Sequence, residues 1–292
     1  MRLWQQQTGG KMVLSRSAAF KMSKSENELK PLRLQTELWR YMDVARFLAL
    51  IDQKELYLPR LHELQSEDPW EGAASPSDPL FGRDPEYMHR AATHFASLPL
   101  VSCWHENETE SVAMWKLYVS GREGVAIKTT VSGLTQLLSV GRELKLGRVV
   151  YRDINDFERS PDIFIFEDGH CRGSADILPI ERNIIFRKNK GYAHEREVRA
   201  AIYDTYCGGQ AIFSTEQFQA LSLGQEPERR PGANVPVDIA VLIHKIVVSP
   251  AFPSWAIKSL QKAVDAAFSP SPPIEVKPSV LLDKPIIVGV GA

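Results

Sequence analysis

The chain has 292 residues, of which 43% are hydrophobic and 24% charged, a composition typical of a globular protein and not of a disordered or fibrous one. A net charge of -1 argues against a protein whose main task is to bind nucleic-acid phosphates. The 3 scattered cysteines argue against a disulfide framework or a structural zinc site, and no apolar run reaches the ~18 residues of a membrane span. We therefore expect a reduced, cytoplasmic protein that does not contact a membrane.

Residues 1–36 are rich in Lys and Arg and show no sustained apolar period, which predicts a flexible basic tail. The periodic sequence begins at Glu37, and we expect a single α+β domain over residues 37–292. It includes a C-terminal helix followed by a tail over residues 269–292, in which the proline-rich stretch 269–278 predicts a linker before a last strand-like segment.

The first half of the domain predicts a strand, a helix and a second strand in close succession. "ELWRYM" (37–42) is the first strand, Asp43 is suited to cap the helix, and "LYLP" (56–59) is the second strand. Prolines and glycines predict a long loop over residues 66–90. The apolar positions expected to face inward from the helix are Val44, Phe47, Leu48 and Ile51.

The remaining pattern continues to alternate short strands with helices. Asn107, with Glu110 three residues later, resembles a capping pair for a helix over residues 108–119. Residues 182–203 read as helical and finish as the strand "EVRAAIY", and residues 222–236 are rich in structure breakers. Irregular spacing favours an α+β fold with short mixed or antiparallel strands and packed helices over a doubly wound sheet. Further strands are expected at 98–104, 124–130, 147–152 and 245–250. A last helix is expected with Ser254 as its cap and with Ile257, Leu260 and Val264 inward.

Common catalytic motifs are missing from the sequence. There is no Gly-x-x-x-x-Gly-Lys-Ser/Thr loop, no Gly-x-Gly-x-x-Gly after a strand, no Gly-x-Ser-x-Gly and no His-Glu-x-x-His. The residues around Cys103 and around Cys171 each include a histidine but lack metal-ligand spacing, so they predict buried cysteines and loop histidines. The apolar stripe of Met114 and Trp115 indicates core packing, whereas Tyr118 could face a cleft.

Glu195 and Glu197 are the most informative acidic pair. Placed at or just before the strand, they would share one face with Arg199 because side chains alternate along a strand. Two carboxylates on one face suit either the stabilisation of an oxocarbenium-like transition state or general acid-base catalysis. The alternative is a structural one, in which Glu197 only pairs with Arg199.

Several stretches resemble a widespread, mostly bacterial domain of unknown function, some of whose members are labelled abortive phage infection proteins. The resemblance rests on "LWRY" (38–41), "DPWEG" (68–72), "MWKLY" with "EGVAI" (114–127) and "HEREVR" (194–199) in this order. It implies a link to phage defence but brings no established activity. Within "DPWEG", Asp68 and Glu71 either cap the turn or reach into a cleft.

The order of elements is also similar to the ADP-ribosyltransferase fold, whose members use NAD as a substrate. That resemblance implies that Arg40 contacts the ribose or phosphate of NAD and that Ser102 supports the nicotinamide ribose. Glu197 would stabilise the cation formed as nicotinamide leaves, and Glu195 would orient or deprotonate the acceptor. The segment Ser102-Cys103-Trp104 departs from the expected Ser-x-Ser. Tyr118 or Trp104 would stack on nicotinamide.

Three functions follow as hypotheses. The first is NAD-dependent ADP-ribosyl transfer, without a metal, to a macromolecular acceptor that is a protein or a nucleic acid. The second is a non-catalytic interaction or sensor module in which the acidic pair belongs to an ion-pair set. The third is a metal-dependent nuclease that uses Asp153 or Asp156 with Glu195, although the expected lysine after the glutamate is replaced by Glu197.

Overall fold

The computed structural model describes residues 32–71, 85–119, 121–140, 144–153, 185–203, 220, 223–226 and 229–281. The predicted tail therefore lies outside the described residues up to residue 31, as do the segment containing Asp156 and Cys171 and the last residues from 282 on. The domain boundaries proposed from the sequence stay a prediction.

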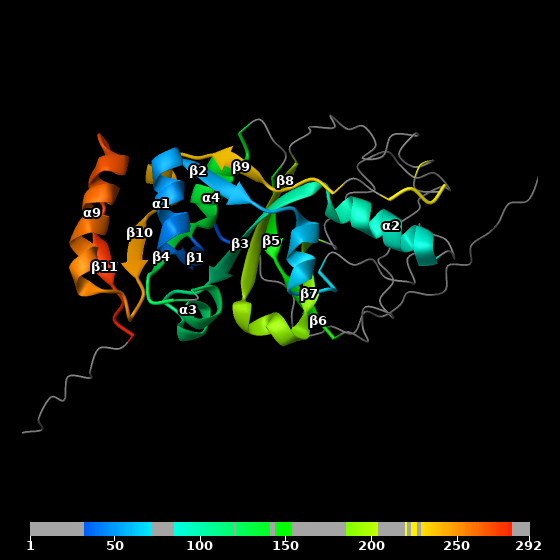
Figure 1. The fold of residues 1–292 in the computed structure, drawn as a ribbon, viewed down its shortest axis with the longest axis horizontal. Helices are drawn as coiled ribbons and strands as arrows, with labels where there is room; N and C mark the ends of the chain where they lie inside the picture. Colours follow the sequence, from blue (N-terminus) through cyan, green and yellow to red (C-terminus); the bar gives the residue numbers. More distant parts are fainter. Residues whose placement is uncertain are drawn as a thin grey trace, which may run out of the picture. The chain divides into compact units, whose positions relative to one another are not determined.

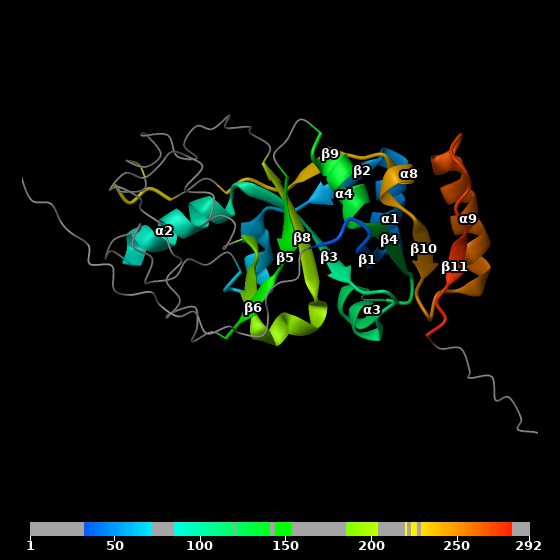
Figure 2. The same ribbon diagram turned by 180° about the vertical axis from the view of Figure 1, so that it is seen from behind.

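The described part of the chain contains a seven-stranded sheet in the order β11-β10-β4-β1-β3-β8-β5 (Figure 1). Neighbouring strands are antiparallel except for β10 and β11, which run parallel. Seen from behind, β8 and β5 lie side by side, away from the end of the sheet formed by β11 (Figure 2). The strands are β1 (Glu37–Asp43), β3 (Pro99–Glu106), β4 (Gly124–Thr130), β5 (Leu144–Arg148), β8 (Glu197–Tyr203), β10 (Lys245–Val248) and β11 (Val276–Pro278).

Two short strand pairs accompany this sheet. β2 (Glu55–Leu58) pairs antiparallel with β9 (Ala233–Pro236), and β6 (Val150–Arg152) pairs parallel with β7 (Arg187–Asn189). Mixed strand directions together with separate helices confirm the predicted α+β class.

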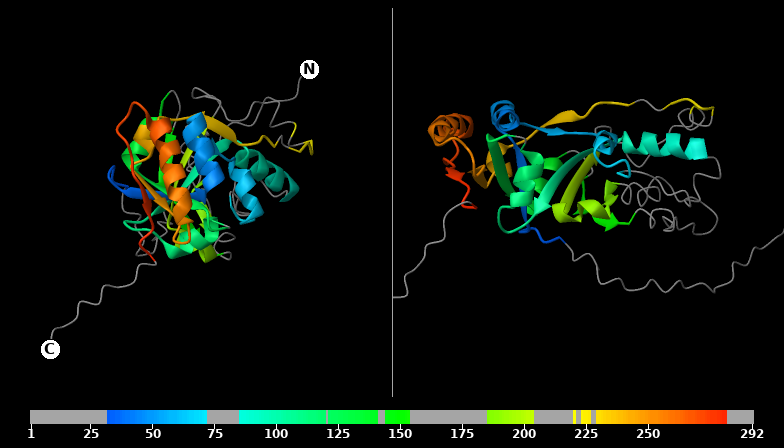
Figure 3. Two further views of the ribbon diagram at one scale, coloured as in Figure 1. Left: turned by 60° about the vertical axis from the view of Figure 1, so that its left-hand side comes forward. Right: turned by 60° about the horizontal axis from the view of Figure 1, so that its bottom comes forward.

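The main hydrophobic core covers one face of the sheet. Leu38 and Met42 of β1 and Ile127 of β4 pack there against four helices. Figures 1 and 3 show α1 and α9 side by side. The alternation of buried residues along β1 explains this packing, because every second side chain faces the same layer. The four helices are α1 (Val44–Gln53), α4 (Val131–Leu138), α8 (Ile239–Leu242) and α9 (Ser254–Phe268).

Two smaller apolar clusters cover the other face. Trp39 and Tyr41 of β1 pack against Met114 and Trp115 of α3, whereas Val101 of β3 packs with residues of η1, α2 and the segment before β7. Because these clusters are separate, the face between them is left to polar side chains. The elements on this face are η1 (Leu61–Ser66), α2 (Pro85–Ala96), α3 (Val112–Tyr118) and η3 (Lys190–Glu195).

β1 and β3 separate along their length. The ladder joins only Leu38 to Glu106 and Trp39 to His105. Further along β3, the backbone N–H of Val101 donates to the carbonyl of Pro59 over 2.8 Å, so the segment after β2 replaces β1 as its neighbour. The sheet therefore opens into a wedge between β1 and β3.

The predicted cap of α1 is confirmed, and the predicted inward face of this helix is corrected at one position. The Asp43 side chain accepts a hydrogen bond from the backbone N–H of Arg46 over 2.8 Å and caps α1 as expected. Within α1, however, Leu50 is buried with Phe47 and Ile51, and Leu48 is 39% exposed. The inward stripe follows the i, i+3, i+4 spacing from Phe47, which turns Leu48 toward solvent.

Other boundaries differ from the predictions. Residues from Pro85 on form α2 in place of the predicted loop, and β9 and β11 lie inside the predicted breaker region and linker. Ser111, and not Asn107, caps α3, because β3 extends to Glu106 and delays the helix. At α9 the cap position is Pro253 and Ser254 is already helical. The strand predicted at 147–152 is split between β5 and β6.

Candidate active site

A cavity of about 490 Å³ opens at the wedge between β1 and β3. This volume lies within the range of small-molecule sites. One wall comes from β1, α1 and β2, and the other comes from β3, α3, β7, η3 and the start of β8. The polar and aromatic residues that line it include Arg40, Tyr41, Tyr57, Glu71, Cys103, Trp104, His105, Tyr118, Lys188, Glu195 and Glu197.

The first wall carries two arginines, Arg40 of β1 and Arg46 of α1, and Arg46 pairs with Asp43. The guanidinium of Arg40 donates to the hydroxyl of Ser102 over 2.9 Å and to the carbonyl of Tyr57 over 3.3 Å, and it lies 5.8 Å from the ring centre of Trp104. Burial lowers the pKa of Arg40 from its ordinary value. Among the described residues no carboxylate forms an ion pair with Arg40. Within the described part of the chain, this cation therefore borders the cavity with neutral partners.

Five charged side chains belong to the second wall or lie directly behind it, as Arg199 does, and they are called the charged cluster below. Arg199, fully buried, donates to Glu197 over 2.6 Å and also to Glu71. The ammonium of Lys188 lies 2.6 Å from Glu195 and 3.5 Å from Glu197. The members are Glu71, Lys188, Glu195, Glu197 and Arg199, each less than a tenth exposed.

The charges in this cluster determine which of its groups are ionised. Burial opposes the ionisation of Glu197, but the charges of Arg199 and Lys188 outweigh it, so its pKa falls to about 2. Burial raises the pKa of Glu71 to about 6, against the opposing effect of Arg199. The surrounding carboxylates keep the pKa of Lys188 above its ordinary value in spite of burial. At neutral pH Glu197 is therefore an anion at the cavity wall.

The two predicted catalytic glutamates line the same cavity, but they lie on different elements of secondary structure and not on one strand face. Glu197 and Arg199 share one face of β8 as expected, but Glu195 ends η3 and is not part of the strand. Arg196 between them adopts a left-handed backbone with φ 44°. Glu195 and Glu197 lie on either side of this residue, and both carboxylates lie beside Lys188.

Three further side chains of this wall contact Glu195 or Glu197. Tyr118 donates its hydroxyl to Glu195 over 2.9 Å, and burial raises the pKa of Tyr118. Nδ1 of His105 lies 2.5 Å from the backbone carbonyl of Glu195. Cys103 borders Glu197, and burial together with this carboxylate raises the pKa of its thiol, which keeps it protonated.

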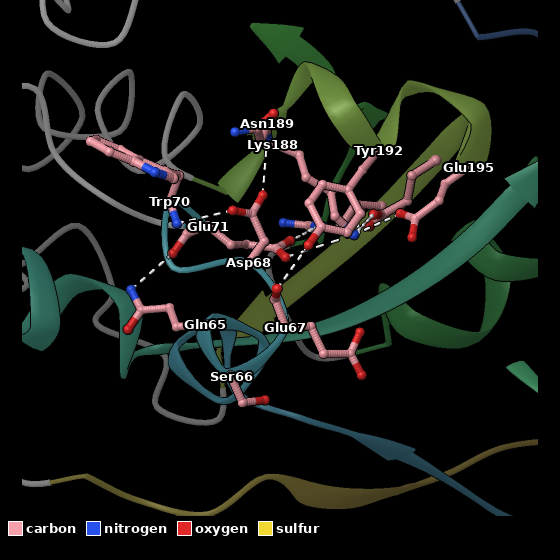
Figure 4. Close-up of polar contacts among 12 residues, drawn as sticks. Gln65, Ser66, Glu67, Asp68, Trp70, Glu71, Lys188, Asn189, Tyr192 and Glu195 are labelled. Atoms are coloured by element: carbon pink, nitrogen blue, oxygen red, sulfur yellow. Dashed lines mark hydrogen bonds and ion pairs between the residues drawn. The ribbon is translucent and has the colours of Figure 1, made fainter. Parts of the chain in front are cut away.

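The "DPWEG" turn attaches to the second wall through both of its acids (Figure 4). Asp68 accepts from the backbone N–H of Trp70 and from that of Asn189, each over 3.0 Å, so it caps the turn and ties it to β7. Glu71 reaches the charged cluster instead and lines the cavity. Tyr192 of η3 completes the attachment by donating to the carbonyl of Glu67 over 2.8 Å.

The structure thus divides the six residues singled out from the sequence into two groups. Arg40, Ser102 and Trp104 lie together, because the indole N–H of Trp104 also donates to Ser102 over 2.9 Å. Glu195, Glu197 and Tyr118 form the second group across the wedge. All but Ser102 line the cavity; Ser102 is fully buried and contacts it through Arg40.

Sequence reasoning gave no site role to Lys188 or His105, and for Glu71 it left open whether the side chain caps the turn or reaches into a cleft. Lys188 lies in a segment that was predicted to be helical, and Glu71 lies in the loop predicted over residues 66–90. His105 is not the loop histidine that was expected but a buried residue of β3. The alternation of side chains along β3 is the signal that could have found His105, because it places this residue on the same face as Cys103. The structure adds that His105 lies opposite Glu197 in the register of β3 and β8.

No group of three or more potential metal ligands gathers within the described residues. Lys188 and Arg199 occupy the space between the carboxylates of the charged cluster, and Asp153 is exposed on the surface. Of the helices described, none has the length and apolar character needed to cross a membrane.

Comparison with known proteins confirms the predicted resemblance to a domain of unknown function. Residues 114–200 match the model of a family described as a protein of unknown function (DUF2971). The match includes α3, β4 and the "HEREVR" segment, and therefore much of the second wall. No curated protein matches the chain.

Among solved structures, the chain aligns with DarT of Thermus sp. 2.9 in complex with NAD+. The two share 8% sequence identity, and the alignment covers 85% of this chain and 98% of that chain with a TM-score of 0.34.

Proposed function

We propose that the cavity binds NAD and that the protein transfers ADP-ribose from it to a macromolecular acceptor. The observation that carries the proposal is the distribution of charge over one cavity: Arg40, with no carboxylate partner among the described residues, borders one wall, and ionised Glu197 borders the other. NAD carries an anionic pyrophosphate, and its ribose becomes cationic as nicotinamide leaves. Opposite charges on the two walls of its site suit both features.

Each predicted residue has a role in this reaction. Arg40 binds the pyrophosphate or ribose, and Ser102 holds the guanidinium in place. Glu197 stabilises the oxocarbenium-like ribose, because a fixed anion in a site shielded from water interacts strongly with developing positive charge. Tyr118 and Trp104 offer aromatic surface at the cavity for the nicotinamide ring. No metal is required for these steps. A role in phage defence, implied by the family resemblance, stays a prediction.

The test uses NAD labelled in the adenylate half and a cell lysate as the source of acceptor. The wild type is expected to transfer label to protein or nucleic acid, and Glu197→Gln to transfer it about 10²-fold more slowly, since the amide lacks the charge. Glu106→Gln is the matched control: Glu106 is also a strand glutamate paired with an arginine, but it does not line the cavity. A wild type that neither binds NAD nor transfers label would refute the proposal.

The non-catalytic module remains the second candidate because the charged cluster has a structural use. Arg199 joins Glu71 of the "DPWEG" turn to Glu197 of β8, and Lys188 of β7 contacts Glu195. In that case Glu197→Gln would lower the melting temperature, and NAD would leave the melting temperature of the wild type unchanged. The same set of proteins therefore distinguishes the two functions.

A further inference from the structure

The hydrogen-bond acceptors of the second wall differ in whether they already have a partner. Both oxygens of Glu195 are occupied, one by the hydroxyl of Tyr118 at 2.9 Å and the other by Lys188 at 2.6 Å. Glu197 is held by Arg199 at 2.6 Å and by Lys188 at 3.5 Å. A carboxylate that already accepts from charged donors is a poor base, because those donors stabilise its anionic form.

His105 is the exception. The residue is 6% exposed and lines the cavity, and its Nε2, which is itself buried, has no hydrogen-bond partner among the described residues. A buried polar atom without a partner is uncommon and calls for an explanation. A ligand in the cavity that brings its own N–H or O–H would satisfy it.

The backbone fixes the protonation pattern of this ring. Nδ1 lies 2.5 Å from the carbonyl oxygen of Glu195, and a carbonyl oxygen can only accept, so Nδ1 carries the hydrogen. In the neutral ring Nε2 therefore holds a lone pair. Burial lowers the pKa of His105, which keeps the ring neutral at physiological pH. The groups around the ring are Tyr41, Glu106, Glu195, Arg196 and Glu197.

We propose that Nε2 of His105 is the proton acceptor of the cavity and, in ADP-ribosyl transfer, deprotonates the incoming acceptor. This inference rests on the proposed function and moves the role of base from Glu195 to His105. The acceptor's oxygen or nitrogen forms a bond to C1′ of the ribose while the bond from C1′ to nicotinamide breaks. The electron pair of the broken bond leaves with nicotinamide, which becomes neutral. The acceptor's proton passes to Nε2 and is then released to water.

Glu195 becomes a positioning residue in this arrangement. Its backbone carbonyl orients the imidazole, and its carboxylate ties η3 to β7 through Lys188 and to α3 through Tyr118. The carbonyl contribution is independent of the side chain at position 195. Glu195→Gln is thus expected to weaken transfer less than a change at His105.

The first experiment compares His105→Asn with the wild type. An asparagine amide can still donate to the carbonyl of Glu195, as Nδ1 does, but nothing replaces Nε2. We expect the Kd for NAD to stay within about threefold and kcat to fall about 10²-fold or more, the usual contribution of a general base. His105→Gln, which offers a polar atom but no basic one, is expected to lose as much.

His194→Asn is the matched control. Nδ1 of His194 also contacts a backbone carbonyl, that of Gly191 at 3.2 Å, but this ring is exposed and lies outside the cavity lining. Full activity of His194→Asn with loss in both His105 variants, all folded by circular dichroism, would support the proposal. An active wild type with unchanged kcat in both His105 variants would overturn it and leave the proposed function intact.

A second measurement does not depend on turnover. The ¹⁵N resonances of His105 in the unliganded protein at neutral pH are expected to show Nδ1 protonated and Nε2 unprotonated. A protonated Nε2 would overturn the proposal whatever the activity. If the wild type does not react with NAD, the proposed function fails, whereas an unprotonated Nε2 in the same sample would still support His105 as the proton acceptor of the cavity.

Discussion

The two walls of the cavity differ in the partners that they offer to an arginine. Arg199, directly behind the second wall, is fully buried and donates to Glu197, Glu71 and the carbonyl of Ile185. Among the described residues, the partners of Arg40 in the first wall are neutral: the hydroxyl of Ser102, the backbone carbonyl of Tyr57 and the ring of Trp104. A buried charge that is matched within the protein stabilises the fold only while its partners remain. A charge without a counterion beside a cavity is instead available to a ligand.

The same contrast separates Glu195 from His105 within the second wall. The glutamate was the conspicuous residue in the sequence, but its oxygens are occupied by Lys188 and Tyr118. The histidine was interpreted from the sequence as a loop residue, yet its Nε2 lacks a partner among the described residues. The state of the hydrogen bonds, and not the residue type, distinguishes a group that holds the fold from one that can react.

Removal of Arg199 is expected to have the largest effect on stability. Arg199→Met leaves the carboxylates of Glu71 and Glu197 buried without their main counterion, and breaking a buried pair in this way costs about 3–5 kcal/mol. Urea unfolding at neutral pH measures the change. Arg46→Met is the control, since the pair of Arg46 with Asp43 is exposed and worth less than about 1 kcal/mol. Equal losses in the two variants would contradict the structural role of the charged cluster.

The next largest change in the free energy of unfolding is expected when the pH is lowered. Because the pKa of Glu197 is about 2 in the folded protein, below its ordinary value of 4.5, its ionised form stabilises the fold above about pH 4.5. This contribution, about 3 kcal/mol at 1.36 kcal/mol per pH unit, is lost as the pH falls from about 4.5 toward 2.

Glu71 has the opposite effect on stability, and it does so over a higher range of pH. Its pKa of about 6 lies above 4.5, so the folded protein takes up this proton first and gains stability as the pH falls from about 6 to 4.5. Glu197→Gln should therefore flatten the loss of stability below pH 4.5 in urea titrations. Glu71→Gln should remove the gain above it. An unchanged profile in Glu197→Gln would show that another group controls acid unfolding.

The strands that form the wedge were predictable, whereas the wedge itself was not. β1, β3 and β4 follow from runs of apolar and β-branched residues, and Asp43 fixes the start of α1 through a local hydrogen bond. The separation of β1 from β3 depends on the segment after β2, whose carbonyl at Pro59 takes the place of β1. Which segment pairs with β3 is decided by tertiary packing and cannot be predicted from the local sequence.

The candidate site divides in the same way. Arg40 and Ser102 were paired from the order of elements, and the structure joins them by a hydrogen bond. Glu195 contacts Lys188 at the end of η3 and is followed by Arg196, whose left-handed backbone separates it from Glu197. That conformation is unusual for a residue other than glycine and cannot be inferred from the sequence. The roles of these residues in catalysis stay predictions until the variants above are measured.

Arg40 is expected to give the smallest change in stability and so to complete the comparison with Arg199. Arg40→Met removes a desolvated cation and two hydrogen bonds to neutral groups, and Ser102 keeps the indole N–H of Trp104 as a donor. Because the cost of burying the charge disappears along with those bonds, the free energy of unfolding should fall by no more than about 1 kcal/mol. Binding of NAD, measured by calorimetry, should nevertheless weaken at least about tenfold, since a charged hydrogen bond to the ligand is lost. A variant as unstable as Arg199→Met would show that Arg40 is part of the folded framework, and unchanged NAD binding would remove it from the ligand site.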